Sequence, residues 1–208
     1  MVETVMALMM ALAGMQVDAM PPAWVPCALV AAADESHGDS FDNLHGDPDF
    51  ICTSFAYHML EEGGLDLDAV SDGDADPSTG LSSQMRALEA LGFTKIDKVD
   101  FATLPAGSVV YACTKGGAPK HVEIYIGTFD LASADGCGNP PFAAEGTPLT
   151  CGARITDRDP APGDQLQGEP GRWYGGEVGA FAWDSRGEDY WSVAYAPPKD
   201  EKGADDGR

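Results

Sequence analysis

The clearest alternation of apolar and polar positions lies in residues 121–127, His-Val-Glu-Ile-Tyr-Ile-Gly. Its aliphatic side chains fall at every second position, which predicts one apolar face on a β-strand. His121, Glu123 and Tyr125 share the opposite face. A β-rich run at 108–113 precedes this strand, and a Gly-containing connection at 115–120 predicts a hairpin between the two. Further short strands are expected at 142–145, 153–156, 177–183 and 191–196.

Helical spacing dominates the first half of the chain instead. Phe55, Met59 and Leu60 form one apolar stripe after Cys52, and two glycines at 63–64 end the predicted helix. A second helix is expected from Ser82 to Leu91, followed by a glycine. Residues 2–15 and 28–33 also have helical patterns, and three prolines in 20–27 predict a break between them. Helices that precede strands indicate the α+β class.

The 208 residues suffice for one good core, and no internal repeat is evident. We expect an N-terminal helical extension (1–45), one main domain (46–197) and a charged tail or linker (198–208). The apolar run from Val5 to Met15 has no Lys or Arg before it, unlike a secretion signal. It is also too short to span a bilayer.

Acidic residues greatly outnumber basic ones, with 34 Asp and Glu against 12 Lys and Arg and a net charge of −22. Such a chain repels nucleic acid and anionic lipid surfaces. We therefore expect neither nucleic acid nor a membrane as a partner.

Five cysteines occur, and none forms a Cys-x-x-Cys pair. This argues against a zinc ribbon or a thioredoxin motif, and no other metal site is predicted. Cys137 and Cys151 flank a Pro-rich loop and could be bridged by a disulfide.

Cys52 and His121 carry the candidate chemistry. Cys52 lies at or just before a helix N-terminus, where unpaired N–H groups and the helix dipole favour a thiolate. The alternative is a buried structural cysteine. His121 opens a strand on its polar face, from which an imidazole can reach a thiol and take its proton. The alternative there is a surface histidine.

Three segments, in chain order, resemble the motifs of the NlpC-type and CHAP-type cysteine peptidases, which hydrolyse bacterial peptidoglycan. These are 52–60 (Cys-Thr-Ser-Phe-Ala-Tyr-His-Met-Leu), 104–111 (Leu-Pro-Ala-Gly-Ser-Val-Val-Tyr) and 121–127. The family's forms are a Cys-Ser helix start, Leu-x-Pro-Gly-Asp-Leu-Val-Phe and His-Val-x-Ile-Tyr-Ile-Gly. The resemblance spans about residues 45–196. It departs at Ser108, where the family has Asp, and no Tyr precedes the cysteine.

The resemblance implies a papain-like fold, with N-terminal helices packed on a central antiparallel β-sheet, and Cys52 and His121 as catalytic residues. In the family a side chain on the next strand orients the imidazole. Glu145 is the expected third catalytic residue, with Glu123, Asp135 and Asn139 as rivals. Glu123 lies roughly 7 Å from His121 along the strand, so we expect it to line the substrate groove. Ser54 is expected either to contact substrate near the oxyanion or to cap the helix.

The resemblance implies a peptidoglycan hydrolase that cuts a stem-peptide bond or the N-acetylmuramoyl–L-alanine amide, without metal or cofactor. The alternatives are a non-catalytic wall- or protein-binding module, or a cysteine hydrolase of another amide. Without a signal peptide, a phage-type lysin or a piece of a larger secreted protein is expected. Because the wall is anionic, a separate wall-targeting domain or subunit is also expected. Late aromatics either stack on substrate or pack in the core: Trp173, Tyr174, Trp183, Tyr190 and Trp191.

Overall fold

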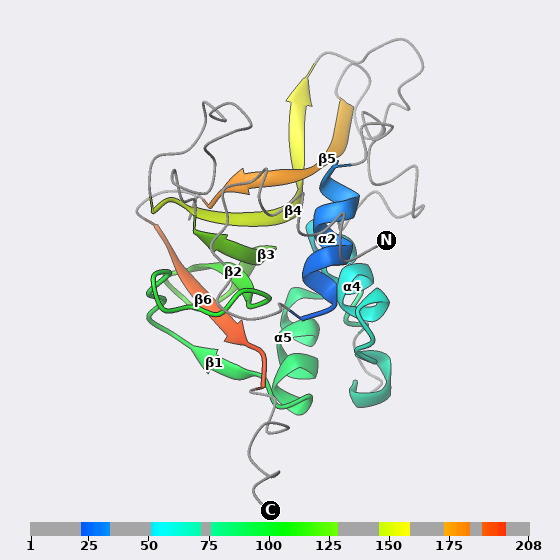
Figure 1. The fold of residues 1–208 in the computed structure, drawn as a ribbon, viewed down its shortest axis with the longest axis vertical. Coiled ribbons are helices and arrows are strands. Elements are labelled where there is room, and N and C mark those ends of the chain that lie inside the picture. Colours follow the sequence, from blue (N-terminus) through cyan, green and yellow to red (C-terminus); the bar gives the residue numbers. More distant parts are fainter. Residues whose placement is uncertain are drawn as a thin grey trace, which may run out of the picture.

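One antiparallel sheet with helices on one face forms the frame of the protein (Figure 1). The computed structural model describes residues 22–33, 51–71, 76–128, 146–158, 173–183 and 189–198. Within them, six strands are ordered β1-β6-β2-β3-β4-β5. The described helices α2, α4 and α5 all precede β1 along the chain. The expected α+β class, with helices before an antiparallel sheet, is confirmed.

The helices are α2 (Trp24–Ala33), α4 (Ile51–Glu62) and α5 (Leu81–Ala90). A short 3₁₀ helix, η2, spans Asp68–Val70. The predicted break over 20–27 is wrong in its second half, because α2 already begins at Trp24. Pro26 lies in the first turn of α2, where its missing N–H would have no intrahelical partner, so the helix tolerates it. The predicted helix at 2–15 lies outside the described residues.

The strands are β1 (Thr94–Ile96), β2 (Val109–Thr114), β3 (Pro119–Thr128), β4 (Pro148–Arg158), β5 (Trp173–Ala182) and β6 (Tyr190–Ala196). The predicted β2–β3 hairpin is confirmed, with Tyr111 opposite Val122 and Ala112 opposite His121. Strands β4 and β5 are longer than predicted and pair with each other along their lengths. The predicted strand at 142–145 and the loop at 131–141 lie outside the described residues.

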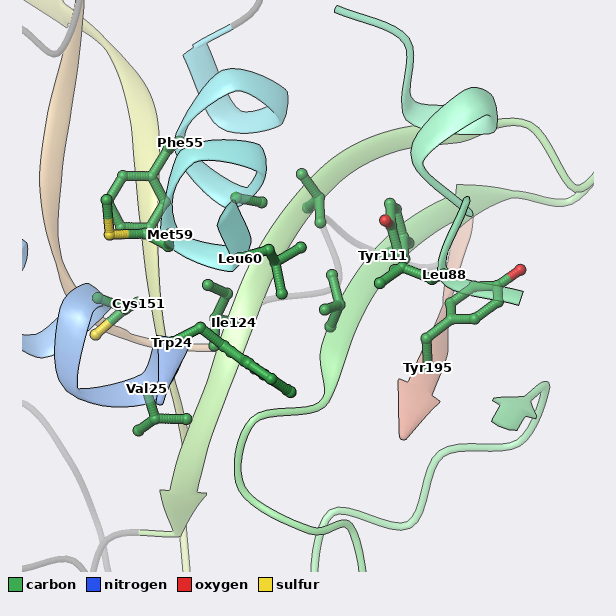
Figure 2. Close-up of a cluster of buried hydrophobic side chains, with 14 of the residues drawn as sticks. Trp24, Val25, Phe55, Met59, Leu60, Leu88, Tyr111, Ile124, Cys151 and Tyr195 are labelled. Carbon is green, nitrogen blue, oxygen red and sulfur yellow. The ribbon is translucent and has the colours of Figure 1, made fainter. Parts of the chain in front are cut away.

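The main core lies between the helices and the sheet (Figure 2). Helix α4 contributes Phe55, Met59 and Leu60, the stripe expected from the sequence, and all three are buried. The aliphatic residues of β3 face these helices, since Val122, Ile124 and Ile126 belong to the same buried cluster. Their burial drives the helices onto this face.

The predicted N-terminal extension contributes to this core. Trp24 is buried, and its indole Nε1 donates a hydrogen bond of 2.8 Å to the carbonyl of Gly107. Gly107 has a φ of +87°, and a Cβ there would lie 2.7 Å from Pro22. The turn before β2 therefore uses glycine both for its backbone conformation and for close contact with the segment that leads into α2.

A second, smaller cluster covers the opposite face of the sheet. Tyr125 and Val110 are buried there, with Phe101 and Trp183 packed against them. The hydroxyl of Tyr125 donates a hydrogen bond of 2.8 Å to the carbonyl of Phe101. His121 and Glu123 alternate with the core residues of β3, so this second face is the one that receives them.

None of the helices in the described ranges combines the length and the apolar character needed to cross a membrane.

Candidate active site

The thiol of Cys52 lies at the start of a helix, as the sequence predicts. Cys52 is the second residue of α4, and the residue as a whole is only partly buried. The hydroxyl of the next residue, Thr53, lies 3.9 Å from the sulfur. Backbone N–H groups of a first helical turn are not used within the helix, and they favour negative charge beside them.

Strand β3 presents its first half to this helix. Tyr125 exchanges backbone hydrogen bonds of 2.8 Å with Gly107 and Ser108 on the β2 side. In an antiparallel pair, successive residues direct their backbone groups to alternate sides of the strand. Even-numbered residues of β3 therefore direct their N–H groups to the side away from β2. In the described pairing, β4 joins β3 only from Ile124 onward. The N–H of Val122 is left to face Cys52, and it hydrogen-bonds the sulfur.

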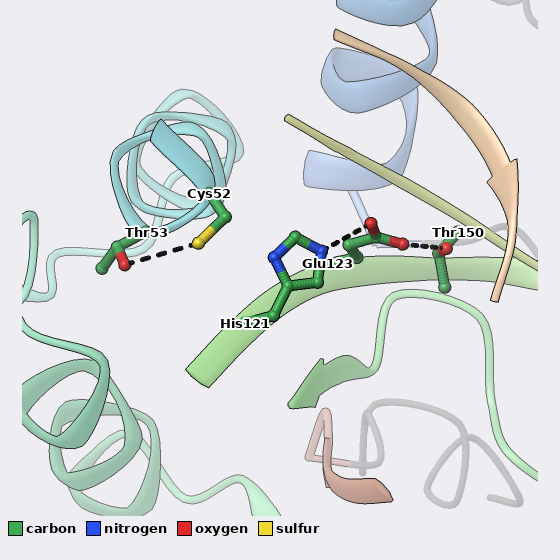
Figure 3. A network of polar contacts seen from close by, with 5 residues as sticks. All are labelled: Cys52, Thr53, His121, Glu123 and Thr150. Atoms are coloured by element: carbon green, nitrogen blue, oxygen red, sulfur yellow. Dashed lines mark hydrogen bonds and ion pairs between the residues drawn. The ribbon is translucent and has the colours of Figure 1, made fainter. Parts of the chain in front are cut away.

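His121 lies between the sulfur and a buried carboxylate (Figure 3). One ring nitrogen faces Cys52, while Nε2 is 2.7 Å from Oε1 of Glu123. The hydroxyl of Thr150, on β4, donates to the other carboxylate oxygen of Glu123. His121 is 3% exposed and Glu123 is fully buried. This arrangement fixes the plane of the imidazole and directs one nitrogen at the thiol.

The expected role of Glu123 in lining a substrate groove is therefore wrong, since the side chain is fully enclosed and bound to His121. The distance of roughly 7 Å expected from the sequence separates the backbone atoms of His121 and Glu123, not their side chains. Side chains lean along the strand direction, and the ring of His121 and the long side chain of Glu123 extend toward each other across that gap. Glu145, the expected third residue, and its rivals Asp135 and Asn139 lie outside the described residues.

The electrostatics favour an ion pair of Cys52 and His121. Burial alone would raise the pKa of the Cys52 thiol, but hydrogen bonds from His121 and from the Val122 N–H, with the charge of His121, lower it overall. Burial alone would lower the pKa of His121, but hydrogen bonds to Cys52 and Glu123 and their charges raise it overall. The thiol therefore loses its proton more readily and the imidazole holds one more firmly.

Gly152, on β4, provides the space that Glu123 occupies. A Cβ at position 152 would lie 2.5 Å from Cγ of Glu123 and 3.0 Å from its Cδ. The resemblance predicts the orienting side chain on the next strand, whereas here the carboxylate beside His121 comes from β3 itself, and β4 supplies the Thr150 hydroxyl that binds it. The sequence gives no sign of this contact, because Gly152 lies between Cys151 and Ala153 and is far from Glu123 along the chain.

Trp183 covers the site from the second face of the sheet. Its ring is stacked on that of His121, with centroids 6.4 Å apart and planes 17° from parallel. Its indole nitrogen donates a hydrogen bond of 2.9 Å to the hydroxyl of Ser192. Among the late aromatics, Trp183 therefore packs against the site and Trp191 is exposed. The side chains of Trp173 and Tyr174 lie outside the described part.

Two further expectations are not met. Ser54 is 3% exposed, and its hydroxyl donates a hydrogen bond of 3.2 Å to the carbonyl of Ser78. It therefore neither lines a groove nor caps α4, because its partner belongs to another loop. Cys151 is a free, fully buried thiol, so the disulfide with Cys137 that the sequence left open is not formed. Cys137 itself lies outside the described residues.

Nowhere in the described part of the chain do three or more His, Cys, Asp or Glu side chains gather as a metal ion would need. Comparisons with protein-family models, with curated proteins and with solved structures found no match for this chain. Functional inference therefore rests on the geometry of this site and on the three sequence motifs.

Proposed function

We propose that the protein is a cysteine-dependent hydrolase in which Cys52 is the nucleophile, His121 the general base and acid, and Glu123 the residue that orients His121. One observation carries the proposal. The thiol of Cys52, a partly buried residue at a helix start, faces a histidine whose other nitrogen is held 2.7 Å from a buried carboxylate. This is the relationship of nucleophile, base and orienting group on which thiol and serine hydrolases depend.

The reaction begins from the Cys52 thiolate and the His121 imidazolium. The sulfur attacks an amide carbonyl carbon, and the negative charge moves to the carbonyl oxygen. Backbone N–H groups at the start of α4, which the helix does not use, stabilise this oxyanion. As the C–N bond breaks, His121 gives its proton to the departing amine, and an acyl-thioester remains on Cys52.

Water completes the cycle. The imidazole, now neutral, takes a proton from a water molecule whose oxygen attacks the thioester carbonyl. The C–S bond breaks, the carboxylic acid leaves, and the thiolate and imidazolium are restored. Glu123 stays ionised throughout and stabilises the positive charge on His121 whenever the ring is protonated.

The resemblance supports a papain-like fold and a peptide amide of peptidoglycan as the substrate. The three motif segments coincide with the start of α4, the turn before β2, and β3. Two of them supply Cys52 and His121, and the glycine of the third makes the turn at Gly107 that α2 packs against. The acidic chain, with a net charge of −22, is expected to need a cationic targeting module to approach an anionic wall.

Digestion of purified peptidoglycan, followed by mass spectrometry of the released fragments, tests this function and identifies the bond that is cut. Cys52→Ala is expected to abolish fragment release while its circular dichroism and melting temperature stay near those of the unaltered protein. Cys27→Ala is the matched control, since Cys27 is also partly buried and free but its pKa is raised. Fragment release that survives in Cys52→Ala would refute the mechanism.

A binding module on the same fold, or a hydrolase of another amide, would give a different result. Peptidoglycan that sediments with the protein without releasing fragments, together with an unreactive Cys52, identifies a binding module. A fast-reacting Cys52 with no fragments from peptidoglycan identifies a cysteine hydrolase of another substrate.

A further inference from the structure

A buried glutamine connects the start of α4 with the sheet. Gln84, in α5, is fully buried, and its Nε2 donates hydrogen bonds to the carbonyls of Thr53 at 3.1 Å and Pro77 at 3.4 Å. Its Oε1 accepts a hydrogen bond of 2.8 Å from the hydroxyl of Tyr111. Each polar atom of this side chain thus has a partner, and the partners belong to three different segments.

These partners adjoin the candidate catalytic residues. Thr53 follows Cys52 in the first turn of α4. Tyr111 is the β2 residue opposite Val122, whose N–H faces the Cys52 sulfur, and the next pair in the register is Ala112 with His121. The path from Thr53 through Gln84 to Tyr111 therefore joins the helix that carries the nucleophile to the strands that carry the base.

We infer that Gln84 and Tyr111 are positioning residues that hold Cys52 at the distance from His121 at which the ion pair forms. This inference rests on the proposed function, because it assumes that Cys52 reacts as a thiolate. Neither residue touches the sulfur or the imidazole in any contact that the structure describes, so both act through the backbone of Thr53 and through β2.

The form of the network argues for positioning over simple stability. The Thr53 carbonyl lies in the first turn of a helix, where the backbone N–H four residues later already satisfies it. The Gln84 bond is additional and fixes where that turn lies. A buried glutamine and a buried tyrosine hydroxyl gain little over apolar residues of similar volume, because their desolvation offsets most of the hydrogen bonding.

The chain offers a matched control in Tyr195. Tyr195 packs edge-on against Tyr111, with ring centroids 5.7 Å apart, and its hydroxyl also donates a 2.8 Å hydrogen bond to α5, at Glu89. Figure 2 shows both tyrosine rings close to Leu88 of α5. Tyr111→Phe and Tyr195→Phe thus each remove one hydrogen bond between a tyrosine hydroxyl of the sheet and α5. Only the hydrogen bond of Tyr111 is linked onward, through Gln84, to α4.

The experiment measures the rate of Cys52 alkylation by iodoacetamide against pH, in the full chain, for Gln84→Met, Tyr111→Phe, Tyr195→Phe and the unaltered protein. The Cys52 peptide is followed by mass spectrometry after cleavage at acidic residues. Trypsin is unsuitable because Arg86 is the first Lys or Arg of the chain, so Cys27 and Cys52 would stay in one peptide. Melting temperatures are measured in parallel.

We expect the pH midpoint of the Cys52 alkylation rate to rise by about one unit in Gln84→Met and Tyr111→Phe. At a pH below both midpoints, these variants then have about tenfold less thiolate than the unaltered protein. Tyr195→Phe is expected to lower the melting temperature by an amount similar to Tyr111→Phe and to leave the midpoint unchanged. A midpoint that stays unchanged in Gln84→Met and Tyr111→Phe, or one that shifts equally in Tyr195→Phe, would overturn the positioning role alone. An ordinary thiol midpoint in the unaltered protein would overturn the proposed function as well.

Discussion

Gly152→Ala adds one methyl group to β4 and is expected to disable His121 without touching it. The new Cβ would lie 2.5 Å from Cγ of Glu123, whereas carbon atoms in contact prefer about 3.5–4.0 Å. Because Gly152 does not adopt a positive φ, alanine brings no backbone strain, and its effect comes from this contact. Glu123 therefore has to move.

The size of that movement sets the expected loss. Relieving the overlap displaces Glu123 by about 1 Å or more. The Nε2–Oε1 distance of 2.7 Å between His121 and Glu123 would then exceed about 3.2 Å, the outer end of ordinary hydrogen bonds. A hydrogen bond to a charged group contributes about 1.5–3 kcal/mol. If the imidazolium loses that stabilisation, the ion pair weakens roughly ten- to hundredfold. Overpacking also lowers the free energy of unfolding by about 1–3 kcal/mol.

The assay is again the rate of Cys52 alkylation against pH, with proton NMR titration of His121 beside it. In Gly152→Ala the pKa of His121 is expected to fall and the midpoint for Cys52 to rise. Gly116→Ala is the control, because its nearest neighbour to a new Cβ is the Thr114 hydroxyl at 3.8 Å and its φ is not positive. It should leave both midpoints in place.

A double-mutant cycle decides whether the effect passes through Glu123. In a Glu123→Ala background the obstructing side chain is gone, so Gly152→Ala should add little further loss. Fully additive losses in the cycle, or an unchanged His121 titration in Gly152→Ala, would refute the account of Glu123 as the orienting residue.

Three further outcomes are expected. Glu123→Gln keeps the shape of the side chain but removes the charge beside His121, so the pKa of His121 should fall by about one unit or more in NMR titration. Because that pKa is raised in the folded protein, the stability from this pair is complete below about pH 6.5 and is lost as the pH rises through the raised value. Glu123→Gln should therefore destabilise the protein more at about pH 6 than at about pH 9; an equal loss would contradict the pairing. Iodoacetamide at neutral pH should label Cys52 before the other described cysteines, whose pKa values are raised, and equal labelling would show that the thiol is not activated. Trp24→Ala should lower the free energy of unfolding by about 3–5 kcal/mol in urea titration, as it empties the core site beside Gly107, and a loss under about 1 kcal/mol would show that α2 is dispensable.

The local patterns of the sequence predict the elements that carry the site. The alternation in 121–127 predicts β3, and the apolar spacing after Cys52 predicts α4 with its end at the glycines. Both depend on periods of two and about 3.6 residues, which a core on one side imposes directly on the sequence. These elements suffice to place a thiol at a helix start and a histidine at a strand.

The contacts between elements could not be predicted in the same way. Spacing along β3 gives the backbone distance between His121 and Glu123, but the direction in which each side chain leans depends on its neighbours. Nothing in the sequence distinguishes Gln84 from other polar helix residues, and only the packing of α5 against α4 and β2 gives it three partners. The start of α2 differs from the prediction because three prolines in 20–27 predict a break, although the first turn of a helix accepts a proline.

The site has two parts, the His121–Glu123 pair and the Cys52 thiol, and different substitutions are expected to disturb each of them. His121 and Glu123 belong to one strand, so their relation is set locally by β3, with β4 supplying the Thr150 hydroxyl and the room at Gly152. Cys52 lies 69 positions earlier, on a separate element, so its distance from His121 depends on how α4 packs against the sheet. Changes in β4 should therefore lower the pKa of His121 first, and the reactivity of Cys52 only as a consequence. Changes in α5 that release the start of α4 should slow Cys52 while His121 keeps its bond to Glu123, so measuring both groups in each variant shows which part has moved.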